Sequence, residues 1–344
     1  MNIKEINNFL KNNKIPSFRL KQIIKAIYHD NIYSFKEITV LPKILREKIE
    51  KEINILSFSK NTVLISKKKD SYKASLELKD GFRIESVLLQ QSKTWSVCIS
   101  SQAGCALGCR FCATGANGFH RNLSQEEIND QVLFWRMYIQ KQNLNINIKN
   151  IVFMGMGEAF MNYSEFKKSM KNFLDPTLFN FSSRHISVST AGLPKGIKKI
   201  SHDFPQINLA ISLICADNKK RTNLMPINNT FNLNEIKEAL NYYFNHTHRK
   251  VFLEYIMFKN INDQKEDANN LIDFIKSNSR PDLLHVNLIA YNMTNGEFKS
   301  SNKKTINWFR NYLLKHRINT TIRKSLGDEI KAACGQLAGQ IDKK

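Results

Sequence analysis

The sequence lacks any apolar run long enough to cross a membrane, and its first residues lack the pattern expected of a secretory leader. The longest apolar runs, such as Ile151-Val152-Phe153-Met154, fall far short of the roughly 20 residues that a membrane-spanning helix needs. The first residues, MNIKEINNFLKNNK, contain no apolar signal core and no small-residue cleavage site. We therefore expect a cytoplasmic protein without a membrane segment, whose six cysteines serve as ligands or catalysts rather than as structural disulfides.

Acidic residues are also scarce. Of the 344 residues, 30 are aspartate or glutamate and 52 are lysine or arginine, so the formal net charge is +22. A surplus of this size favours binding to a polyanion, with RNA or DNA as the first candidate, because cations that neutralise phosphates release counterions. The alternative is a surface that serves only solubility, since net charge does not determine fold. Apolar residues make up 42% of the chain, which excludes a disordered protein and is enough for a large core.

The residue pattern divides the chain into four regions. Residues 1–55 contain helical patterns with interleaved lysine and arginine, and we interpret them as an accessory RNA-binding module; an ordinary solvated helix face is the alternative. Residues 56–90 are rich in β-forming residues and are expected to form a β-rich connector. Residues 91–325 form the expected core, and residues 326–344 form a C-terminal segment.

The core shows a repeat of strand followed by helix. The expected strands are 95–99, 151–154, 186–190, 207–213, 251–258 and 284–291, and helical patterns lie at 125–140, 163–173, 194–201, 233–245, 265–277 and 303–316. A capping box, Ser124 with Glu127, marks the start of the first helix, which places Ile128, Val132 and Trp135 on one face. Strand–helix units in series predict an α/β fold with a parallel sheet, either a partial barrel or a doubly wound sheet. In both, the chemistry collects at the C-terminal ends of the strands.

Three cysteines with the spacing CxxxCxxC, Cys105, Cys109 and Cys112, follow the first core strand. A loop at that place can direct three thiolates at one centre, and a cluster held by three cysteines leaves one iron free to bind a substrate. Structural zinc is the competing interpretation, but zinc needs four ligands and only His120 is a conceivable fourth. Three cysteines within eight positions of a glycine-containing loop argue against ordinary core residues.

The runs around these cysteines resemble the RlmN/Cfr family of radical S-adenosylmethionine (SAM) RNA adenine methyltransferases. An aromatic residue before the last cysteine, here Phe111, is typical of the radical SAM superfamily. The longer matching runs are Ser100-Ser101-Gln102-Ala103-Gly104-Cys105, Phe111-Cys112-Ala113-Thr114-Gly115, Leu41-Pro42-Lys43, Met154-Gly155-Met156-Gly157-Glu158, Met225-Pro226-Ile227-Asn228 and Ala332-Ala333-Cys334-Gly335-Gln336-Leu337. Together they span almost the whole chain. The resemblance implies a radical SAM partial (β/α)6 barrel with a small N-terminal helical module and a short β-rich extension.

The resemblance also implies a 4Fe–4S cluster held by Cys105, Cys109 and Cys112, with SAM bound to the open iron. Cleavage of SAM yields a 5′-deoxyadenosyl radical, which suits a target carbon of adenine that is a poor nucleophile. The family's SAM-contacting positions match Gly157, Glu158, Ser189, Ser212, Leu213, Ile214 and Asn292. Polar residues at strand ends are the alternative interpretation of the two serines.

Three further residues match the family's catalytic positions. Cys334 is implied to accept a methyl group from a first SAM and to carry it as S-methylcysteine while a second SAM supplies the radical, so that two SAM molecules are used per turnover. Cys98 is implied to resolve the covalent RNA adduct, leaving a transient disulfide with Cys334, and Glu85 to act as the proton acceptor or a substrate contact. The alternatives are a buried strand cysteine for Cys98 and a surface carboxylate for Glu85. Cys215 matches no catalytic position.

Two branches of the family methylate different carbons of adenine, and this chain carries features of both. Ala159 and the run 175–179 resemble the C8-methylating Cfr branch, whereas the run 322–327 is about as close to the C2-methylating RlmN branch. Ile214 stands where both branches usually carry histidine, and Met293 replaces a usual proline. We therefore expect C8 methylation of an adenine in 23S rRNA at the peptidyl-transferase centre. The alternative is C2 methylation of the same adenine and of tRNA.

The Cfr-like interpretation carries further expectations. It implies resistance to ribosome-targeting antibiotics, a reducing electron donor such as flavodoxin or ferredoxin, and a monomer. Two other classes of function stay open from the residues: a radical SAM enzyme acting on a small molecule or peptide, and a non-catalytic, zinc-stabilised RNA-binding module. The basic surplus and the pair Cys98 and Cys334 argue against the first of these. Measurement of the iron and sulfide content would distinguish a zinc-stabilised module from an iron–sulfur enzyme.

Overall fold

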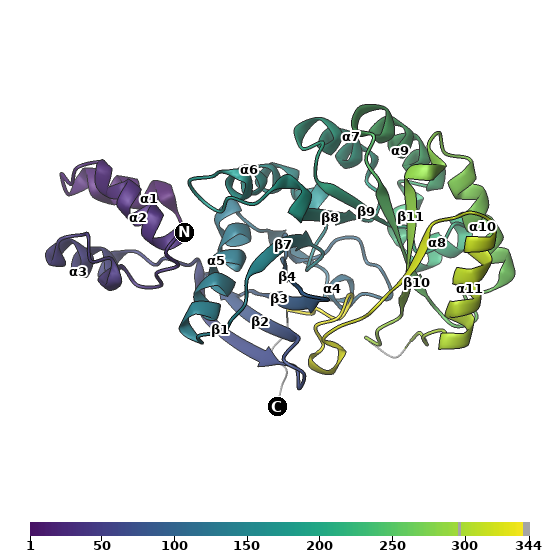
Figure 1. Ribbon diagram of the computed structural model, residues 1–344, viewed down its shortest axis with the longest axis horizontal. Coiled ribbons are helices and arrows are strands. Elements are labelled where there is room, and N and C mark those ends of the chain that lie inside the picture. Colours follow the sequence, from purple (N-terminus) through teal and green to yellow (C-terminus); the bar gives the residue numbers. More distant parts are fainter. Residues whose placement is uncertain (295–296, 340–344) are drawn as a thin grey trace.

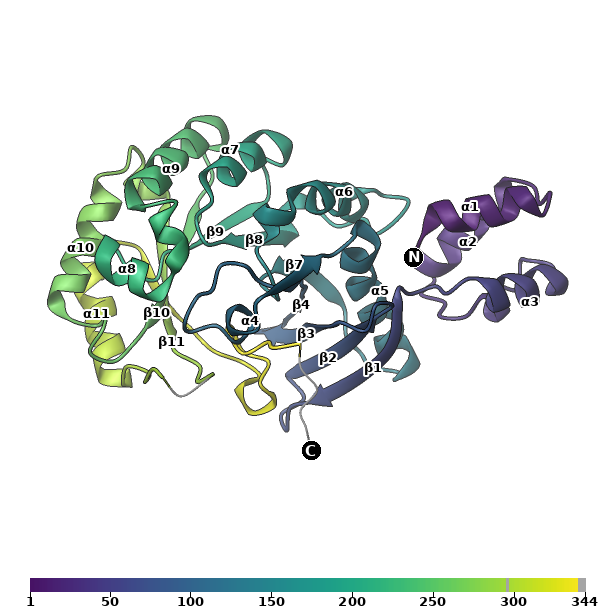
Figure 2. The same cartoon turned by 180° about the vertical axis from the view of Figure 1, so that it is seen from behind.

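The computed structural model describes residues 1–294 and 297–339. Figure 1 shows a group of N-terminal helices, an antiparallel run of strands, and a curved parallel sheet with helices along its outer side. Figure 2 shows the same parts from behind. The predicted α/β fold with a partial barrel is confirmed. None of the helices in the described ranges is long and apolar enough to cross a membrane.

The N-terminal helices project from the body of the molecule (Figures 1 and 2). They are α1 (Ile3–Asn12), α2 (Phe18–Tyr28) and α3 (Lys43–Glu52), with the short 3-10 helix η1 (Phe35–Glu37) before the last. Asn2 caps α1 by accepting a hydrogen bond from the amide of Glu5 at 3.0 Å. The apolar side chains of Ile6, Ile23 and Ile27 are fully buried. The packing of these amphipathic faces therefore stabilises the module.

The described residues contain one ten-stranded sheet, in the order β1-β2-β3-β4-β7-β8-β9-β10-β11-β12. The first four strands pair antiparallel: β1 (Phe58–Ile65), β2 (Ser71–Leu78), β3 (Arg83–Gln91) and β4 (Thr94–Cys98). From β4 onward the pairing is parallel, through β7 (Ile148–Phe153), β8 (Ile186–Thr190), β9 (Asn208–Ser212), β10 (Val251–Met257), β11 (Leu284–Ala290) and β12 (Thr320–Arg323).

All six predicted core strands are present, and their ends lie within three residues of the predicted ones. A further parallel strand, β12, pairs with β11 at the edge of the sheet and lies outside the predicted set. It has only four residues, and the middle two are exposed. A strand of this length gives no run of alternating polarity that could reveal it.

Helices connect the parallel strands, and one short 3-10 helix follows the last strand. They are α5 (Gln125–Lys141), α6 (Tyr163–Leu174), α7 (Pro194–Asp203), α8 (Asn218–Leu224), α9 (Leu233–Thr247), α10 (Lys265–Lys276) and α11 (Lys303–Lys315), with short 3-10 helices η2 (Ala159–Asn162), η3 (Ser183–His185), η4 (Pro226–Asn229), η5 (Pro281–Leu283) and η6 (Asp328–Ile330). Six of these seven α-helices coincide with predicted helical patterns, and α8 and the one-turn helix α4 (Ala113–Ala116) are additions. The predicted capping box is confirmed: the Ser124 hydroxyl accepts from the Glu127 amide at 3.2 Å, and the Ser124 amide donates to the Glu127 carboxylate at 2.9 Å.

The first helix of the core shows how the sheet is covered. Ile128, Val132 and Trp135 of α5 are fully buried, as the pattern predicts. The Trp135 indole N–H donates to the Ser86 hydroxyl on β3 at 2.9 Å, so its one polar group is satisfied. Because the parallel strands all run the same way, their C-terminal ends meet at one edge, where the loops that carry the sequence motifs begin.

Candidate active site

The CxxxCxxC motif lies in an excursion of the chain between β4 and α5. Strands β5 (Gln102–Gly104) and β6 (Phe119–Asn122) pair antiparallel, and between them lie the motif and the one-turn helix α4 (Ala113–Ala116). Gly104 closes this hairpin with φ +78°, and a Cβ there would lie 2.1 Å from the carbonyl oxygen of Gly118. Only glycine permits so close an approach of the two strands. The three cysteines therefore sit in a loop whose two ends are joined.

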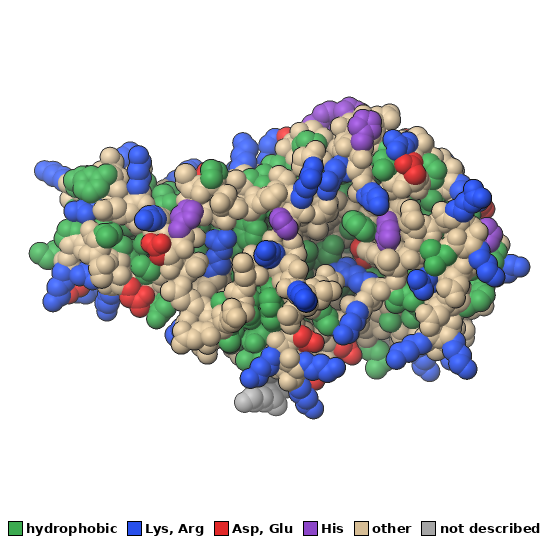
Figure 3. Space-filling view, in the orientation of Figure 1, with side chains coloured by type: hydrophobic (Ala, Val, Ile, Leu, Met, Phe, Trp, Pro, Cys, Tyr) green, Lys and Arg blue, Asp and Glu red, His purple; other side chains and the backbone are tan. Residues whose placement is uncertain are grey.

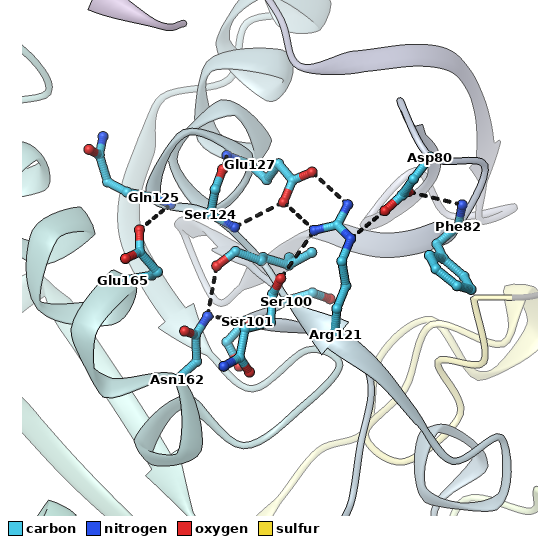
Figure 4. A network of polar contacts seen from close by, with 12 residues as sticks. Asp80, Phe82, Ser100, Ser101, Arg121, Ser124, Gln125, Glu127, Asn162 and Glu165 are labelled. Carbon is cyan, nitrogen blue, oxygen red and sulfur yellow. Dashed lines mark hydrogen bonds and ion pairs between the residues drawn. The ribbon is translucent and has the colours of Figure 1, made fainter. Parts of the chain in front are cut away.

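Polar contacts fix the base of this excursion to its surroundings (Figure 4). The Arg121 guanidinium on β6 donates to both carboxylate oxygens of Glu127 on α5, at 2.7 and 2.8 Å, and also pairs with Asp80. The Asn162 side chain donates to the carbonyl oxygen of Ser101 at 2.9 Å. Because a bidentate arginine–carboxylate pair restrains orientation as well as distance, these contacts define the position of the loop relative to α5.

A cavity of about 170 Å³ lies beside the strand ends and is lined by Cys105, Cys109 and Cys112. The other predicted site residues that line it are Gly157, Glu158, Ser189, Ser212, Ile214 and Cys334. The three motif cysteines are half-buried. The structure thus brings together residues from the motif loop, from the ends of β7, β8 and β9, and from the C-terminal segment.

The donor set suits an iron–sulfur cluster better than a zinc ion. In the ranges that the structure describes, no three His, Cys, Asp or Glu side chains converge to hold a single metal ion. His120, the conceivable fourth zinc ligand, stacks on the Phe82 ring at a centroid separation of 4.5 Å and lines a different cavity. Thiols spread around a cavity can instead bind separate irons of one cluster. Burial raises the pKa of Cys105 to about 12, so a thiolate there needs a cationic partner such as iron.

Glu158 joins the ends of two strands beside the cavity. Its buried carboxylate accepts hydrogen bonds from the amides of Phe160 and Ala191, at 3.1 and 2.8 Å. Burial raises the pKa of Glu158 to about 7. Each carboxylate oxygen has lone pairs to spare, so the group can also accept from a cationic ligand, which would favour its charged form.

Gly157 lets the chain after β7 pass close to Gln102. Its φ is +91°, and a Cβ there would lie 2.5 Å from the Gln102 Cβ and 2.8 Å from the Gln102 amide nitrogen. We expect Gly157→Ala to lower the free energy of unfolding by about 2–4 kcal/mol, because a left-handed backbone and a clash both oppose the methyl group. Gly81 is the matched control, since it has φ +86° with open space around it, so that Gly81→Ala costs only about 1–2 kcal/mol. Denaturant titration measures both losses, and equal losses would contradict the close approach.

Of the remaining predicted SAM contacts, two serines line the cavity, whereas Leu213 and Asn292 do not. The hydroxyls of Ser189 and Ser212, on the neighbouring strands β8 and β9, lie 3.2 Å apart in a hydrogen bond. Leu213 and Asn292 are buried but are not among the residues that line the cavity. The Asn292 side chain donates to the carbonyl oxygen of Cys334 at 3.2 Å. Asn292 therefore supports the segment that carries Cys334.

The C-terminal segment lies against the motif loop and places Cys334 at the cavity. The amide of Ala113 donates to the carbonyl oxygen of Gly335 at 2.8 Å, and the Thr114 hydroxyl donates to that of Leu337 at 2.5 Å. The Cys334 side chain is exposed, in contrast to the buried Cys98. The predicted segment extends to residue 344, and its residues 340–344 lie outside the described residues.

Cys98 ends β4 and, unlike Cys334, is not among the residues that line the cavity. Burial, and secondarily the negative charge of Cys334, raises the pKa of the Cys98 thiol to about 12. Arg323 of β12 lines the cavity, and the charges of Cys334 and then of Glu254 raise the pKa of its guanidinium. The burial of Cys98 agrees with either interpretation of this residue.

Glu85 is 2% exposed, so the surface-carboxylate alternative is wrong. One oxygen of its carboxylate lies 3.0 Å from the Lys73 ammonium on β2, and the other accepts from the amide of Ala338 at 2.8 Å. Glu85 is not among the residues that line the cavity. In this structure it anchors the C-terminal segment a few residues beyond Cys334.

Two charged residues at the cavity lie outside the predicted set. Glu254 of β10 and Arg323 both line it, 3.4 Å apart between Oε2 and Nη1, and Asn287 of β11 donates to the other Glu254 oxygen at 3.0 Å. The sequence does carry a signal for Glu254, which is the one charged residue within the apolar strand VFLEYIM. A buried charge in such a strand indicates a site, since an unpaired one is costly.

Known proteins resemble the chain over nearly its whole length. Residues 99–275 match the radical SAM superfamily, and residues 1–55 match the ribosomal RNA large subunit methyltransferase N-terminal domain. The ribosomal RNA large subunit methyltransferase Cfr of Clostridium botulinum (strain Okra / Type B1) is 43% identical over 336 residues, which cover 97% of this chain and 96% of the relative. Cfr of Staphylococcus aureus is 38% identical over 97% of this chain and 95% of its own.

A solved structure agrees with these relatives. The crystal structure of a radical SAM methyltransferase from Sphaerobacter thermophilus is 32% identical, with a TM-score of 0.91, and the match covers 99% of this chain and 98% of that one. Similarity in sequence and in structure thus extends over both the N-terminal helices and the sheet. The chain belongs to the RlmN/Cfr family of radical SAM methyltransferases, and the curated relatives described above carry the name Cfr.

Proposed function

We propose that this enzyme methylates C8 of an adenine in 23S rRNA at the peptidyl-transferase centre. Membership of the radical SAM methyltransferases supports SAM and a 4Fe–4S cluster as cofactors, and relatives named for ribosomal RNA methylation support rRNA as the substrate. The observation that carries the proposal is that Cys334 lines the same cavity as Cys105, Cys109 and Cys112. A methyl-carrying cysteine must lie within reach of the group that activates it.

The three motif cysteines are proposed to hold the cluster. SAM is proposed to lie among Gly157, Glu158, Ser189, Ser212, Leu213, Ile214 and Asn292. When bound, the cluster and SAM supply a carbon-centred radical that abstracts hydrogen, together with the methyl group. Glu158 accepts from the ammonium of SAM, which pairs its buried carboxylate with a positive charge.

Cys334 and Cys98 are proposed to take part in two different covalent steps. Cys334 is proposed to carry the methyl group on its sulfur, so that one SAM donates the methyl and a second supplies the radical. Once the carbon is joined to adenine, the Cys98 thiolate attacks the Cys334 sulfur. The bond from that sulfur to the carbon breaks as the disulfide forms, its electron pair stays with the adenine-bound carbon, and a proton from solvent completes the methyl group. Glu85 is the proposed proton acceptor, and the Lys73 ammonium and the Ala338 amide hold its carboxylate in place.

The choice of carbon rests on the Cfr branch. Relatives named Cfr are 38–43% identical to the chain, and Ala159 resembles that branch. C2 methylation of the same adenine and of tRNA is the alternative, because the run 322–327 is about as close to the C2-methylating branch. C8 methylation is proposed to confer resistance to ribosome-targeting antibiotics. Electrons are proposed to come from a reducing protein such as flavodoxin or ferredoxin, and the enzyme to act as a cytoplasmic monomer.

RNA binding is expected to weaken steeply with salt. Lysine and arginine side chains are spread over the face in Figure 3 with few acidic ones between them, in keeping with a net charge of +22. We expect the affinity for a 23S rRNA fragment to fall by about a hundredfold or more between roughly 50 and 200 mM salt, because phosphate contacts release counterions. Fluorescence anisotropy measures this fall, with a peptide nucleic acid of the same base sequence as a phosphate-free control. An affinity that does not change with salt would argue against an RNA substrate.

Deuterium-labelled SAM tests the proposed reaction itself. Reconstituted enzyme, reductant and a 23S rRNA fragment are incubated with SAM whose methyl group is fully deuterated, and the digested RNA is examined by mass spectrometry. The new methyl group on adenine should retain two deuterium atoms, because one is abstracted before the carbon joins the base and a solvent proton replaces it. A methyl group with three deuterium atoms would mean direct polar transfer, and no methylated adenine would exclude RNA adenine as the substrate.

A further inference from the structure

Ile214, on the wall of the cavity, has a backbone conformation that isoleucine rarely adopts. Its φ is +65°, and the amide of Cys215 donates to the carbonyl oxygen of Leu213 at 2.7 Å, which makes a γ-turn centred on Ile214. A positive φ at a β-branched residue is a genuine outlier, since the Cβ crowds the main chain. Such conformations persist only where the surroundings hold them, and they cluster at ligand sites.

Two fully buried polar side chains hold this turn from behind. The Asn262 amide donates to the carbonyl oxygens of Ile214 and Ile256, both at 2.8 Å. The Arg221 Nε donates to the carbonyl oxygen of Leu213 at 3.0 Å. Both residues of the turn are therefore held through their carbonyl groups by buried donors from other parts of the chain.

Arg221 also spans the neighbouring strand ends. One of its terminal nitrogens donates to the carbonyl oxygen of Ala191, after β8, at 2.5 Å, and to that of Ser212 at 3.4 Å. The other donates to the Asn228 side chain at 2.8 Å, which gives a structural role to the last residue of the run Met225-Pro226-Ile227-Asn228. The guanidinium thus joins the two strand ends that flank the cavity.

The turn leaves only an apolar surface facing the cavity. The amide of Ile214 donates to the carbonyl oxygen of Glu254 at 3.2 Å, so its main-chain donor and acceptor are both used inside the protein. The side chain lines the cavity and belongs to the same buried cluster as Leu107, Phe111 and Met225, which line it too. The strained backbone conformation therefore directs the Ile214 side chain toward the cavity.

We infer that Arg221 and Asn262 are positioning residues that hold Ile214 in a left-handed turn, so that its side chain forms an apolar wall of the SAM cavity. The inference rests on the proposed function in one respect, because it takes this cavity to be the SAM site. Arg221 and Asn262 act through the main chain of the turn.

The relative stability of alanine and glycine variants tests the strain directly. Glycine in place of alanine ordinarily destabilises a protein, because glycine loses more freedom on folding. At position 214 this order should be reversed, since only glycine adopts a positive φ without strain, and Ile214→Gly should melt about 2 °C or more above Ile214→Ala. Ile289 of β11 lines the same cavity with an ordinary strand backbone and is the matched control. At position 289 the alanine variant should melt at a higher temperature than the glycine variant. If the alanine variant also melts higher at position 214, the inference is overturned.

A double-mutant cycle tests the role of Arg221 in binding. Arg221→Lys should weaken SAM binding to the reconstituted enzyme about tenfold, the size expected when one strained turn is released. In the Ile214→Gly background the same change should cost less than about threefold, because glycine needs no support. Equilibrium dialysis at matched iron content gives both values. The same loss in both backgrounds would show that Arg221 does not act through the turn. If the parent enzyme bound no SAM, the proposed function would fail, while the melting order at position 214 would still decide on the strain.

Discussion

Cys334→Ala is expected to abolish methylation of RNA while leaving the iron content of the enzyme unchanged. Cys334 lies on the C-terminal segment and not in the motif loop, so its loss removes the proposed methyl carrier without removing a proposed cluster ligand. Mass spectrometry of the peptide that contains Cys334 should show a methyl adduct in the parent enzyme and none in the variant. Cys215→Ala is the matched control, since the side chain of Cys215 is buried and has no proposed role, and the substitution retains the main-chain amide that closes the turn at Ile214. It should methylate RNA normally.

Cys98→Ala is expected to accumulate protein covalently bound to RNA through Cys334. Carbon–carbon bond formation with adenine can still occur in this variant, but no second sulfur is available to attack Cys334 and release the base. A crosslinked species should appear on a denaturing gel, disappear with RNase, and leave a nucleotide mass on the Cys334 peptide. If Cys98 is only a small buried side chain, its alanine variant should lose about 1 kcal/mol of stability and methylate normally without a crosslink. That outcome would separate this chain from the proposed mechanism.

Alanine at any of the three motif cysteines is expected to remove the cluster. After anaerobic reconstitution the parent enzyme should hold about four irons per chain and a brown colour, and each of Cys105→Ala, Cys109→Ala and Cys112→Ala should lose most of both. Formation of 5′-deoxyadenosine from SAM should vanish with the iron. Cys215→Ala again serves as the control and should retain both. Zinc without iron in the reconstituted parent enzyme would contradict an iron–sulfur site and restore the zinc alternative.

The parts of the fold that the sequence predicts well are those with local signals. The Ser124–Glu127 capping box and the buried face of α5 depend on residues within two helical turns of one another. The core strands are short runs of apolar residues bounded by polar loops, so their positions can be predicted from the sequence. β12 and α8 escape prediction because four and seven residues carry too little periodicity.

The details of the site that escape prediction depend on distant parts of the chain. Glu85 is buried because Lys73 and the amide of Ala338 converge on it, and nothing near Glu85 in the sequence indicates either partner. The left-handed turn at Ile214 is held by Asn262 and Arg221 against the preference of isoleucine itself. Local propensity cannot reveal a conformation that tertiary contacts impose.

The most direct measurement is the identity of the methylated base in 23S rRNA. Ribosomal RNA from cells that express this chain, or its Cys334→Ala variant, is digested to nucleosides for mass spectrometry, and the position is mapped by primer extension. We expect 8-methyladenosine at one adenine of the peptidyl-transferase centre with the active chain and none with the variant. 2-Methyladenosine at that adenine would assign the enzyme to the alternative carbon. Ribosomal RNA with no additional methyladenosine would contradict the proposed function as a whole.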